Sequence, residues 1–181
     1  PAYNVAIRTN GTLWAWGAND TGQLGDGTTT TRTSPVQVGS AATWASLAPG
    51  GFSTLAVRTD GTLWAWGDNA TGQLGDGTTT DRLAPAQVGS ASTWKQASAS
   101  LYHVAAVRTD GTLWAWGANG SGWHVLAGRS DGTLWAWGEN GRGQLGDGTT
   151  ISRSVPAQVG SATNWDRVEV GSGFVTGLRR S

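Results

Sequence analysis

Hydrophobic and polar residues alternate in short runs along the whole chain, a pattern typical of β-strands. The most regular run is LWAWG within the string GTLWAWG. In its first copy, Trp14 and Trp16 are predicted to point to one face, with Leu13, Ala15 and Gly17 on the other. Both faces are apolar, so these strands are predicted to be buried on both sides. The tryptophan face of one unit is expected to nest against the alanine and glycine face of the next.

A second apolar run precedes the GTLWAWG string and ends in Asn-Gly or Asp-Gly. The first three pairs are Asn10-Gly11, Asp60-Gly61 and Asp110-Gly111. Because such pairs supply the positive φ of a two-residue type I′ turn, each is predicted to join two strands in a hairpin. Further along each of three repeats, a P-x-Q-V run begins with a proline. Because proline has no backbone N–H to donate, this run is predicted to form an edge strand at the outer rim of its unit. These prolines are Pro35, Pro85 and Pro156.

The chain repeats itself with a period near 50 residues, since GTLWAWG recurs at spacings of 50, 50 and 21. Three of the four copies are followed by GQLGDGT, then by P-x-Q-V-G-S, and then by a tryptophan at Trp44, Trp94 or Trp165. Several short strands in a unit of this length predict a β-propeller or a solenoid. Residues 1–181 are interpreted as one array, with units at about 1–50, 51–100, 101–122 and 123–181.

The third unit is truncated. Gly122 is followed directly by WHVLAGRSDG, which aligns with FSTLAVRTDG at 52–61, so the spacing of 21 leaves out 29 residues. These would form one GQLGDGT loop, one P-x-Q-V strand and one strand at the later tryptophan. Two explanations stay open: the gene lost the segment, or the printed sequence omits it. Omission is favoured, because a deletion would strip one blade of its edge strand and the next of its innermost strand.

Unit length and the motifs G-x-L-W-x-W-G, G-Q-L-G-D-G-T and P-x-x-V, in that order, resemble the regulator of chromosome condensation repeat along essentially the whole chain. The resemblance implies an all-β protein, a β-propeller of four-stranded antiparallel blades, seven in the best-known members. The 181 residues account for about 3.6 blades, or about 4.2 with the 29 residues restored. We therefore expect a piece of a longer ring, or self-association of two copies that completes about seven blades.

The composition excludes several classes of binding partner and reactive site. With 12 basic and 12 acidic residues the net charge is zero, which argues against a nucleic-acid partner held by bulk electrostatics. No cysteine is present, so thiol nucleophiles, zinc thiolates and disulfides are excluded. No apolar run is long enough to span a membrane. The start at Pro1 suggests a fragment or a processed product, and the likeness to bacterial or archaeal repeats favours a secreted or cell-surface location.

Three groups of polar residues are candidates for chemistry. Asp26, Asp76 and Asp147 supply one carboxylate per loop, whereas calcium needs six to eight oxygens, so we attribute them to turn chemistry. His103 and His124, placed one residue apart in repeat phase, are interpreted as structural. No catalytic, metal or cofactor residue is predicted, because near-identical repeats offer the same side chains at every blade.

Two arginine series recur with the repeat. The first is expected to be largely neutralised by acids two residues later, and the second lies near the rim, where exposed ion pairs contribute only about 0–1 kcal/mol. The first series is Arg8, Arg58, Arg108, Arg129 and Arg179, with the acids Asp60, Asp110 and Asp131. The second series is Arg32, Arg82 and Arg153.

The WAW tryptophans are predicted to form the structural core. They are Trp14, Trp16, Trp64, Trp66, Trp114, Trp116, Trp135 and Trp137. Trp123 lies outside both tryptophan series and shares its phase with Tyr102. We take Tyr102, Trp123 and Arg142 as candidate partner-binding residues.

The sequence favours a non-enzymatic scaffold for protein–protein interaction, with loops that vary between repeats. The variable positions are 18–20, 68–70, 139–142 and the stretch before each proline. Guanine-nucleotide exchange on a small GTPase is the alternative that the family's founding member suggests, but its wedge insertion and basic tail have no counterpart here. A carbohydrate-binding surface is a further alternative, given the 12 tryptophans.

Overall fold

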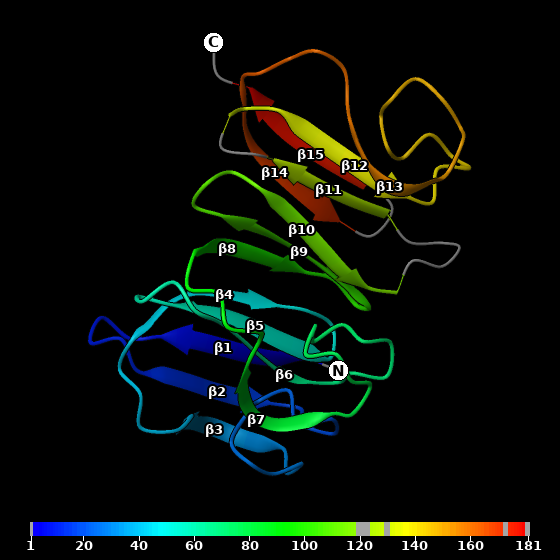
Figure 1. Cartoon of the computed structure of the whole chain (residues 1–181). Coiled ribbons are helices and arrows are strands. Elements are labelled where there is room, and N and C mark those ends of the chain that lie inside the picture. The colour runs from blue at the N-terminus through cyan, green and yellow to red at the C-terminus, as the bar shows by residue number, and fades with distance from the viewer. Residues whose placement is uncertain (1, 119–123, 129–130, 172–173, 180–181) are drawn as a thin grey trace. The chain divides into compact units, whose positions relative to one another are not determined.

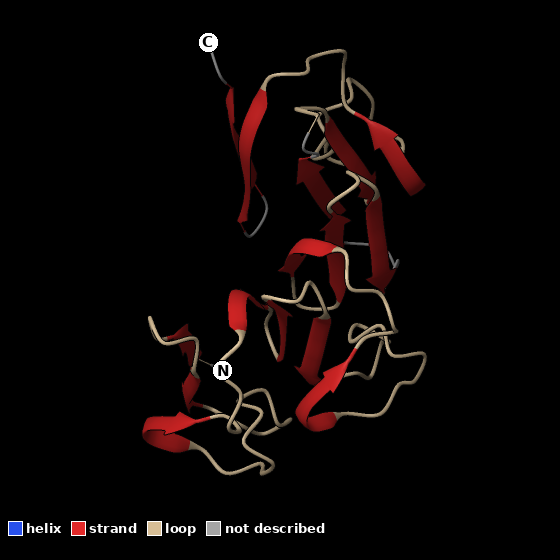
Figure 2. Ribbon diagram, turned by 60° about the vertical axis from the view of Figure 1, so that its left-hand side comes forward, coloured by secondary structure: helices blue, strands red, loops and turns tan. Residues whose placement is uncertain are grey.

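The structure is a computed structural model that describes residues 2–118, 124–128, 131–171 and 174–179, with the backbone alone from residue 166 onward. Every element in these ranges is a β-strand (Figure 2). The prediction of an all-β antiparallel protein is confirmed. Across the described ranges, no helix of the length and apolarity needed to cross a membrane is present. The chain divides into two compact units, which we describe separately.

Unit 1 comprises Pro1–Asp110 and Trp114–Ala118 and contains three antiparallel sheets (Figure 1). The middle sheet is a complete four-stranded blade, of order β4-β5-β6-β7, and its two neighbours have the orders β1-β2-β3 and β10-β9-β8. The strands are β1 (Tyr3–Ile7), β2 (Leu13–Gly17), β3 (Arg32–Gln37), β4 (Trp44–Pro49), β5 (Ser53–Arg58), β6 (Leu63–Gly67), β7 (Arg82–Gln87), β8 (Trp94–Ala99), β9 (His103–Arg108) and β10 (Leu113–Gly117).

Unit 2 comprises Gly111–Leu113 and Asn119–Ser181 and contains two further sheets. Their orders are β11-β12-β13 and β14-β15. The strands are β11 (His124–Gly128), β12 (Leu134–Gly138), β13 (Arg153–Gln158), β14 (Trp165–Gly171) and β15 (Phe174–Arg179).

The truncated third unit leaves the strands that its sequence predicts. The sheet β10-β9-β8 has no described counterpart of β7, and the sheet β11-β12-β13 has none of β4. One sheet thus lacks an outer strand and the other an inner strand, as expected from the 29 missing residues. The joint itself, Gly122–Trp123, lies outside the described residues.

The proline-bearing strands take the predicted edge positions. Pro85 lies in β7, which pairs with β6 alone, and Pro35 lies in β3, which pairs with β2 alone. An edge strand needs no N–H on its outer side, so proline costs no sheet hydrogen bond there. At the opposite edge, β4 contacts both β1 and β8 of the neighbouring sheets. The sheets therefore approach one another at the β4 side.

The hairpins form where predicted, but their turn is not type I′. A type I′ turn needs a positive φ at both residues of the pair, but in Asn10-Gly11 only the glycine has one, of +79°. No described residue other than glycine has a positive φ. The Gly11 N–H donates to the Arg8 carbonyl (2.8 Å), and the Arg8 N–H donates to the Thr12 carbonyl (2.9 Å). These bonds define a type I turn followed by a left-handed glycine. Asn10 instead accepts hydrogen bonds from the Thr12 N–H and hydroxyl, which hold it in an Asx turn.

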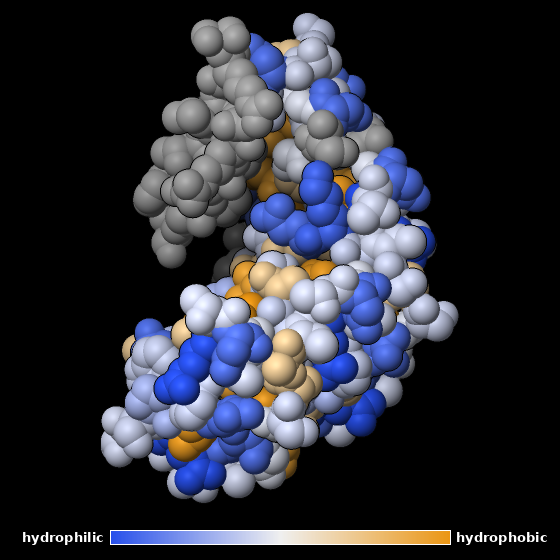
Figure 3. All heavy atoms as spheres, turned by 90° about the vertical axis from the view of Figure 1, so that its left-hand side faces the viewer, coloured by the Kyte–Doolittle hydropathy of each residue, from blue (hydrophilic) through white to orange (hydrophobic). Residues whose placement is uncertain are grey.

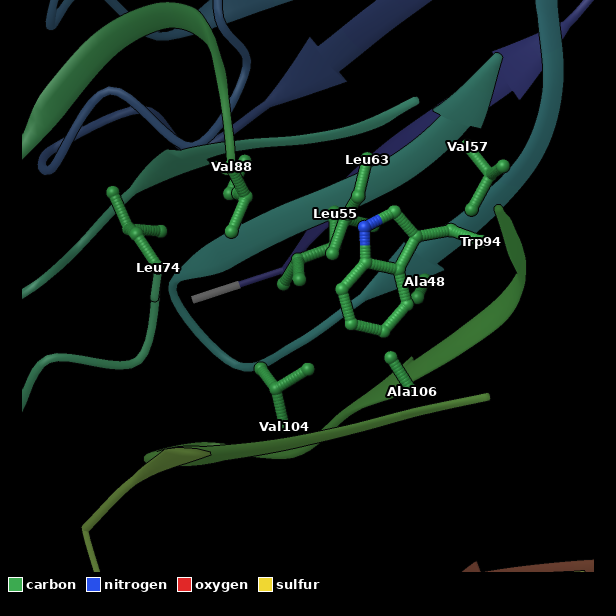
Figure 4. Packing of buried hydrophobic residues seen from close by; sticks show 10 residues of the cluster. Ala48, Leu55, Val57, Leu63, Leu74, Val88, Trp94, Val104 and Ala106 are labelled. Atoms are coloured by element: carbon green, nitrogen blue, oxygen red, sulfur yellow. The ribbon is translucent and has the colours of Figure 1, made fainter. Parts of the chain in front are cut away.

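A hydrophobic core fills the space between the sheets β4-β5-β6-β7 and β10-β9-β8 (Figure 4). Leu55 and Leu63 of the first sheet are fully buried, and Val104 and Ala106 of the second are each 1% exposed. The indole of Trp94 lies among them, next to Ala48 and Ala106. Burial of side chains of this size stabilises the fold by about 1.5–3 kcal/mol each.

The GQLGDGT loop of one repeat packs against a tryptophan of the next. The Trp66 Nε1 donates to the Gln23 carbonyl (3.0 Å), and Trp116 makes the same bond to the Gln73 carbonyl (3.0 Å). A Cβ added at Gly25 would lie 2.6 Å from Trp66 Nε1. Glycine is therefore required at this position, because the indole occupies the space that any side chain would need.

The two tryptophans of each WAW run have different surroundings. Trp66 is fully buried in a cluster with Leu13, Ala15 and Leu24 of the first repeat, so its partners are a leucine, an alanine and the loop. Trp14, Trp16, Trp64, Trp116 and Trp135 are half-buried, and Trp137 is buried.

Trp114 departs from the predicted core, since it is 46% exposed. In the complete blade its counterpart Trp64 stands opposite Gln87 of the outer strand β7. No described outer strand follows β10, and the ring is exposed for that reason.

We predict that Gly25→Ala destabilises the protein more than Gly27→Ala. Both glycines have a positive φ, of +77° and +83°, so both substitutions introduce backbone strain of about 1–2 kcal/mol. Only at Gly25 does the new methyl group meet a buried indole; nothing lies within 4 Å at Gly27. The overpacking should add about 1–3 kcal/mol, measured by urea unfolding. Equal losses in the two variants would show that the loop–tryptophan contact is not tight.

Candidate functional site

A buried asparagine organises the loop that follows each of the LWAWG strands β2, β6 and β12. Asn19 is fully buried; its Nδ2 donates to the carbonyls of Thr28 (2.9 Å) and Thr30 (3.2 Å). Its Oδ1 accepts from the Leu24 N–H (2.9 Å). Asn69 and Asn140 make the corresponding bonds in their own loops. One side chain therefore closes a loop of about a dozen residues and holds it rigid.

The aspartate of GDGT completes the same network. Asp26 accepts at Oδ1 from the Thr28 N–H (3.0 Å) and hydroxyl (2.7 Å) and from Asn19 Nδ2 (3.2 Å). Its Oδ2 accepts from Arg32 Nε at 2.6 Å, an ion pair in which the Asp26 side chain is 6% exposed. Both oxygens are thus engaged by donors of the same repeat. The pairs Asp76–Arg82 and Asp147–Arg153 repeat the arrangement.

The hydrogen bonds hold these carboxyl groups in their charged form. Burial by itself would raise the pKa of Asp76, but hydrogen bonds from Thr78 and Arg82 outweigh it and lower the pKa to about 2. The pKa of Asp26 is lowered for the same reasons. Hydrogen bonds from Thr149 and Arg153 lower the pKa of Asp147. A carboxylate held in this way is a structural anion and a poor general acid at neutral pH.

The asparagines were predicted to lie among the variable, partner-facing positions, and this prediction was wrong. Asn19, Asn69 and Asn140 are each fully buried. The signal was available, because each asparagine stands seven residues before the aspartate of its own repeat. Two polar residues at a constant separation across a turn-rich segment indicate a closed loop.

The exposed residues of these loops flank the buried asparagine. Asp20 and Ala70 follow it directly, and Gly141 and Arg142 follow Asn140. Each loop continues from the carboxyl end of its LWAWG strand, whereas the Asn-Gly or Asp-Gly hairpin stands at the other end. On the face that Figure 3 shows, hydrophilic and hydrophobic residues are intermingled over the lower part of the molecule.

The three candidate partner-binding residues fall in different places. Tyr102 is half-buried in unit 1, and its carbonyl accepts from the Ala118 N–H (2.8 Å). Arg142 is exposed in unit 2, where its N–H donates to Gln144 Oε1 (2.9 Å). Trp123 lies outside the described residues. Tyr102 and Arg142 therefore belong to separate compact units, and their roles stay predictions.

The two histidines occupy the same position in their repeats, so the predicted offset of one residue between them was wrong. His103 and His124 each stand eight residues before the hairpin glycine, and His124 lies opposite Gly138 as Tyr3 lies opposite Gly17. His103 is buried and lies within hydrogen-bond distance of the Ser100 hydroxyl (3.0 Å to Nδ1).

His124 has a different environment. Its Nε2 is buried and has no hydrogen-bond partner among the described residues, and burial lowers the pKa of His124. Tyr3, at the same phase, donates to the carbonyls of Gly50 (3.1 Å) and Ser53 (2.7 Å). This register position thus accepts different side chains, and the bonds of Tyr3 join it to a neighbouring sheet.

The first arginine series stacks on tryptophans. The Arg58 guanidinium carbon lies 4.5 Å from the Trp44 ring centroid and 3.7 Å from that of Trp64. Burial lowers the pKa of Arg58, and the nearby charge of Asp60 partly opposes this. Aromatic faces thus contact Arg8, Arg58 and Arg108, and such contacts stabilise by about 0.5–2 kcal/mol. Arg8 and Arg108 stack likewise on Trp14, Trp94 and Trp114; Arg129 lies outside the described residues, and Arg179 is described by its backbone alone.

A small aromatic pocket lies beside the truncated blade. Its volume is about 260 Å³, and Trp94, Trp114, Trp116 and Arg108 form much of its wall with Val88 and the following turn. The Arg108 guanidinium lies 4.3 Å from the centroid of Trp114. The pocket combines apolar rings with one cation.

We predict that the network makes stability depend on pH below about 4. Asp76 has a pKa of about 2 in the folded protein and about 3.9 in an unfolded chain. Its contribution is therefore complete above pH 4 and is lost as the pH falls towards 2. Asp76→Asn should lower the free energy of unfolding at pH 7 and flatten its decline between pH 4 and 2, as measured by urea titration. The exposed Asp20→Asn is the matched control; parallel curves for all three proteins would contradict the prediction.

Comparison with protein families matches the regulator of chromosome condensation (RCC1) repeat at residues 10–57, 60–107 and 131–178. A second model of the same repeat matches residues 44–73 and 94–122. A search of curated proteins finds no match.

Solved structures of similar fold include human WBSCR16, with a TM-score of 0.82, 23% identity, and coverage of 99% of this chain and 56% of that protein. Yeast RCC1 (Prp20) bound to Kap60 gives a TM-score of 0.59 and 19% identity over 99% of this chain and 41% of the other. The structure of Prp20p from Saccharomyces cerevisiae gives a TM-score of 0.56 and 19% identity, over 99% of this chain and 42% of the other.

These identities show the fold, and the chain spans about half the length of these proteins or less. The array of antiparallel sheets is thus part of a β-propeller with incomplete blades. Because the matched repeats cover most of its length, the chain belongs to the regulator of chromosome condensation (RCC1) repeat family.

Proposed function

We propose that this chain is a non-catalytic β-propeller module that binds a protein partner through the loops after its LWAWG strands. The observation that carries the proposal is that buried and exposed residues of each loop have different roles. Buried Asn19, Asn69 and Asn140 hold the backbone, while the residues directly after them are exposed and differ between repeats. A rigid backbone that presents variable side chains suits recognition, because little conformational entropy is lost on binding.

The absence of catalysis is supported by how the polar side chains are used. The carboxylates of Asp26, Asp76 and Asp147 are engaged by threonine, asparagine and arginine of their own repeats. Catalysis needs different groups that converge on one point, whereas these recur one per blade.

The outer strands add exposed apolar side chains to the proposed surface. Leu83 of β7 is 39% exposed and Val155 of β13 is 66% exposed, each shortly before the proline of its strand. The counterpart positions in β3 are Thr33 and Ser34. This stretch therefore varies between repeats, as predicted from the sequence, and it offers different contacts at different blades.

The relatives favour a protein partner over other ligands. Yeast RCC1 (Prp20) is bound to Kap60 in its structure, and Prp20p has binding properties to Gsp1p and histones. Those partners belong to those proteins. For this chain they support the class of partner, and they make nucleotide exchange on a small GTPase the alternative to test. Carbohydrate binding stays a weaker alternative, supported by the exposure of Trp114.

We predict that the purified chain does not accelerate nucleotide release. A small GTPase loaded with a fluorescent guanine nucleotide should release it at the spontaneous rate at every concentration of the chain. The reason is that no described residue departs from the repeat in a way that would supply a protruding wedge. A concentration-dependent increase in the release rate would replace the scaffold proposal with exchange activity.

We also predict that the partner contacts the loop end of the strands. A photo-crosslinking amino acid at Asp20 or at Arg142, both exposed, should give a discrete crosslinked species in cells of the source organism. The same group at Asn10, exposed at the hairpin end of β2, is the control and should give none. Crosslinking from Asn10 alone would place the interface at the hairpin end. If none of the three positions gives a crosslink, the proposal is rejected.

A further inference from the structure

The first hairpin carries an amide at the position where the other hairpins carry a carboxylate. Asn10 stands there in the first repeat, and Asp60, Asp110 and Asp131 stand there in the others. An amide differs from a carboxylate because its carbonyl carbon is open to attack by a nucleophile and its nitrogen can leave as ammonia. The residue after Asn10 is a glycine, whose backbone nitrogen has no neighbouring side chain to hinder an attack on that carbon.

The turn holds the side chain of Asn10 in place and polarises its carbonyl group. The Asn10 Oδ1 accepts from the Thr12 N–H (3.2 Å) and from the Thr12 hydroxyl (2.7 Å). The hydroxyl itself accepts from Trp14 Nε1 (3.0 Å), which strengthens its donation to Asn10. Donors at this oxygen stabilise the negative charge that it gains when the carbon is attacked. Asn10 is exposed, and across the described residues nothing accepts from its Nδ2, so ammonia can leave into water.

The fold keeps the glycine next to this asparagine. Gly11 has a φ of +79°, and a Cβ at this position would collide with the Ala42 carbonyl. The Gly11 N–H donates to the Arg8 carbonyl (2.8 Å), and this bond must open before the nitrogen can lose its proton. Exposed turns open locally at a small free-energy cost, so the bond slows the reaction without preventing it.

Asn140 and Gly141 form another Asn-Gly pair in an opposite environment. Asn140 is fully buried, and its Nδ2 donates to the carbonyls of Thr149 (3.0 Å) and Ile151 (3.1 Å). Its Oδ1 accepts from the Leu145 N–H (2.9 Å). Loss of ammonia there would break the bonds that close the loop. The same dipeptide is therefore reactive in the hairpin and protected in the loop.

We propose that Asn10 is a self-modification site, at which the protein deamidates in water without an enzyme. The Gly11 nitrogen loses its proton to hydroxide and attacks the Asn10 Cγ. The new N–Cγ bond closes a cyclic succinimide, while the Cγ–Nδ2 bond breaks and the nitrogen leaves with a proton from water as ammonia. Water then opens the ring at either carbonyl, which gives aspartate or isoaspartate. Overall, water is consumed and ammonia is released, and nothing is oxidised or reduced.

The aspartate product fits the hairpin. At the same place in the second repeat, Asp60 Oδ1 accepts from the Thr62 N–H (2.9 Å) and hydroxyl (2.6 Å). These are the bonds that Asn10 receives from Thr12. Conversion to aspartate therefore gives the first repeat the acid that the other repeats already have, with the turn unchanged.

The isoaspartate product does not fit, because it adds a methylene to the main chain before Gly11. Gly11 has no room to shift, since it packs against the Ala42 carbonyl. This product should therefore loosen the hairpin. Asn10 lies at the hairpin end of β2, so the modification is independent of the interaction role proposed for the loops at the other end.

Peptide mass spectrometry of the full chain, incubated at mildly alkaline pH, tests the proposal. The tryptic peptides 9–32, 109–129 and 130–142 separate Asn10 from the other Asn-Gly pairs of the sequence, and fragment ions separate it from Asn19. We expect Asn10 to convert at least about tenfold faster than Asn140, because opening the buried loop costs more free energy. The rate at Asn10 should rise in proportion to the hydroxide concentration, and an isoaspartate methyltransferase should label the product. In urea that unfolds the chain, the two rates should agree within about twofold.

Two variants complete the test. Asn10→Gln is the matched control, because a glutamine needs a larger ring that closes far more slowly, and its peptide should release no detectable ammonia. Asn10→Asp should unfold at the same urea concentration as the original chain. Equal rates at Asn10 and Asn140 in the folded chain, a rate at Asn10 that is independent of pH, or continued release from Asn10→Gln would each overturn the proposal. A lower unfolding midpoint for Asn10→Asp would overturn the fit of the aspartate product.

Discussion

Contact between the backbone of one repeat's loop and an indole of the next repeat is the constraint on which the rest of unit 1 depends. Trp66 lies where a side chain on Gly25 would be, and Trp116 stands in the same relation to Gly75. Each ring also donates to a glutamine carbonyl of that loop. Packing and hydrogen bonding therefore require the same backbone placement, and a change in either would disturb the other.

The loop can bear this contact because polar groups within it keep its shape. Asn19 bonds to backbone groups on both sides of the turn, and Asp26 joins it to Arg32. Buried polar groups with all their partners in place rigidify a structure, whereas partly satisfied ones destabilise it. The asparagine, aspartate and arginine of the repeat thus hold the loop in its conformation. The residues that we propose to contact a partner lie just outside this network.

The LWAWG strands share one sequence but differ in burial. β10 and β6 have the same five-residue sequence, LWAWG, yet Ala65 is buried and Ala115 is exposed. Ala65 is buried in a cluster that includes Trp94, Val104 and Ala106 of the following sheet. An identical sequence can therefore be core in one blade and exposed in another, because burial depends on the residues that pack against the strand.

The sequence alone predicted the strands, the edge position of the prolines and the missing strands of the truncated unit, because alternation and proline chemistry act locally. It also predicted hairpins at the Asn-Gly and Asp-Gly pairs, although the turn type depended on a glycine that also packs against Ala42. The tertiary structure decided which polar residues are buried, and it turned Asn19 from a candidate contact into a structural residue. It also decided that Arg58 stacks between Trp44 and Trp64. These contacts join residues from different strands and loops, so they depend on how the strands are brought together, which no local pattern contains.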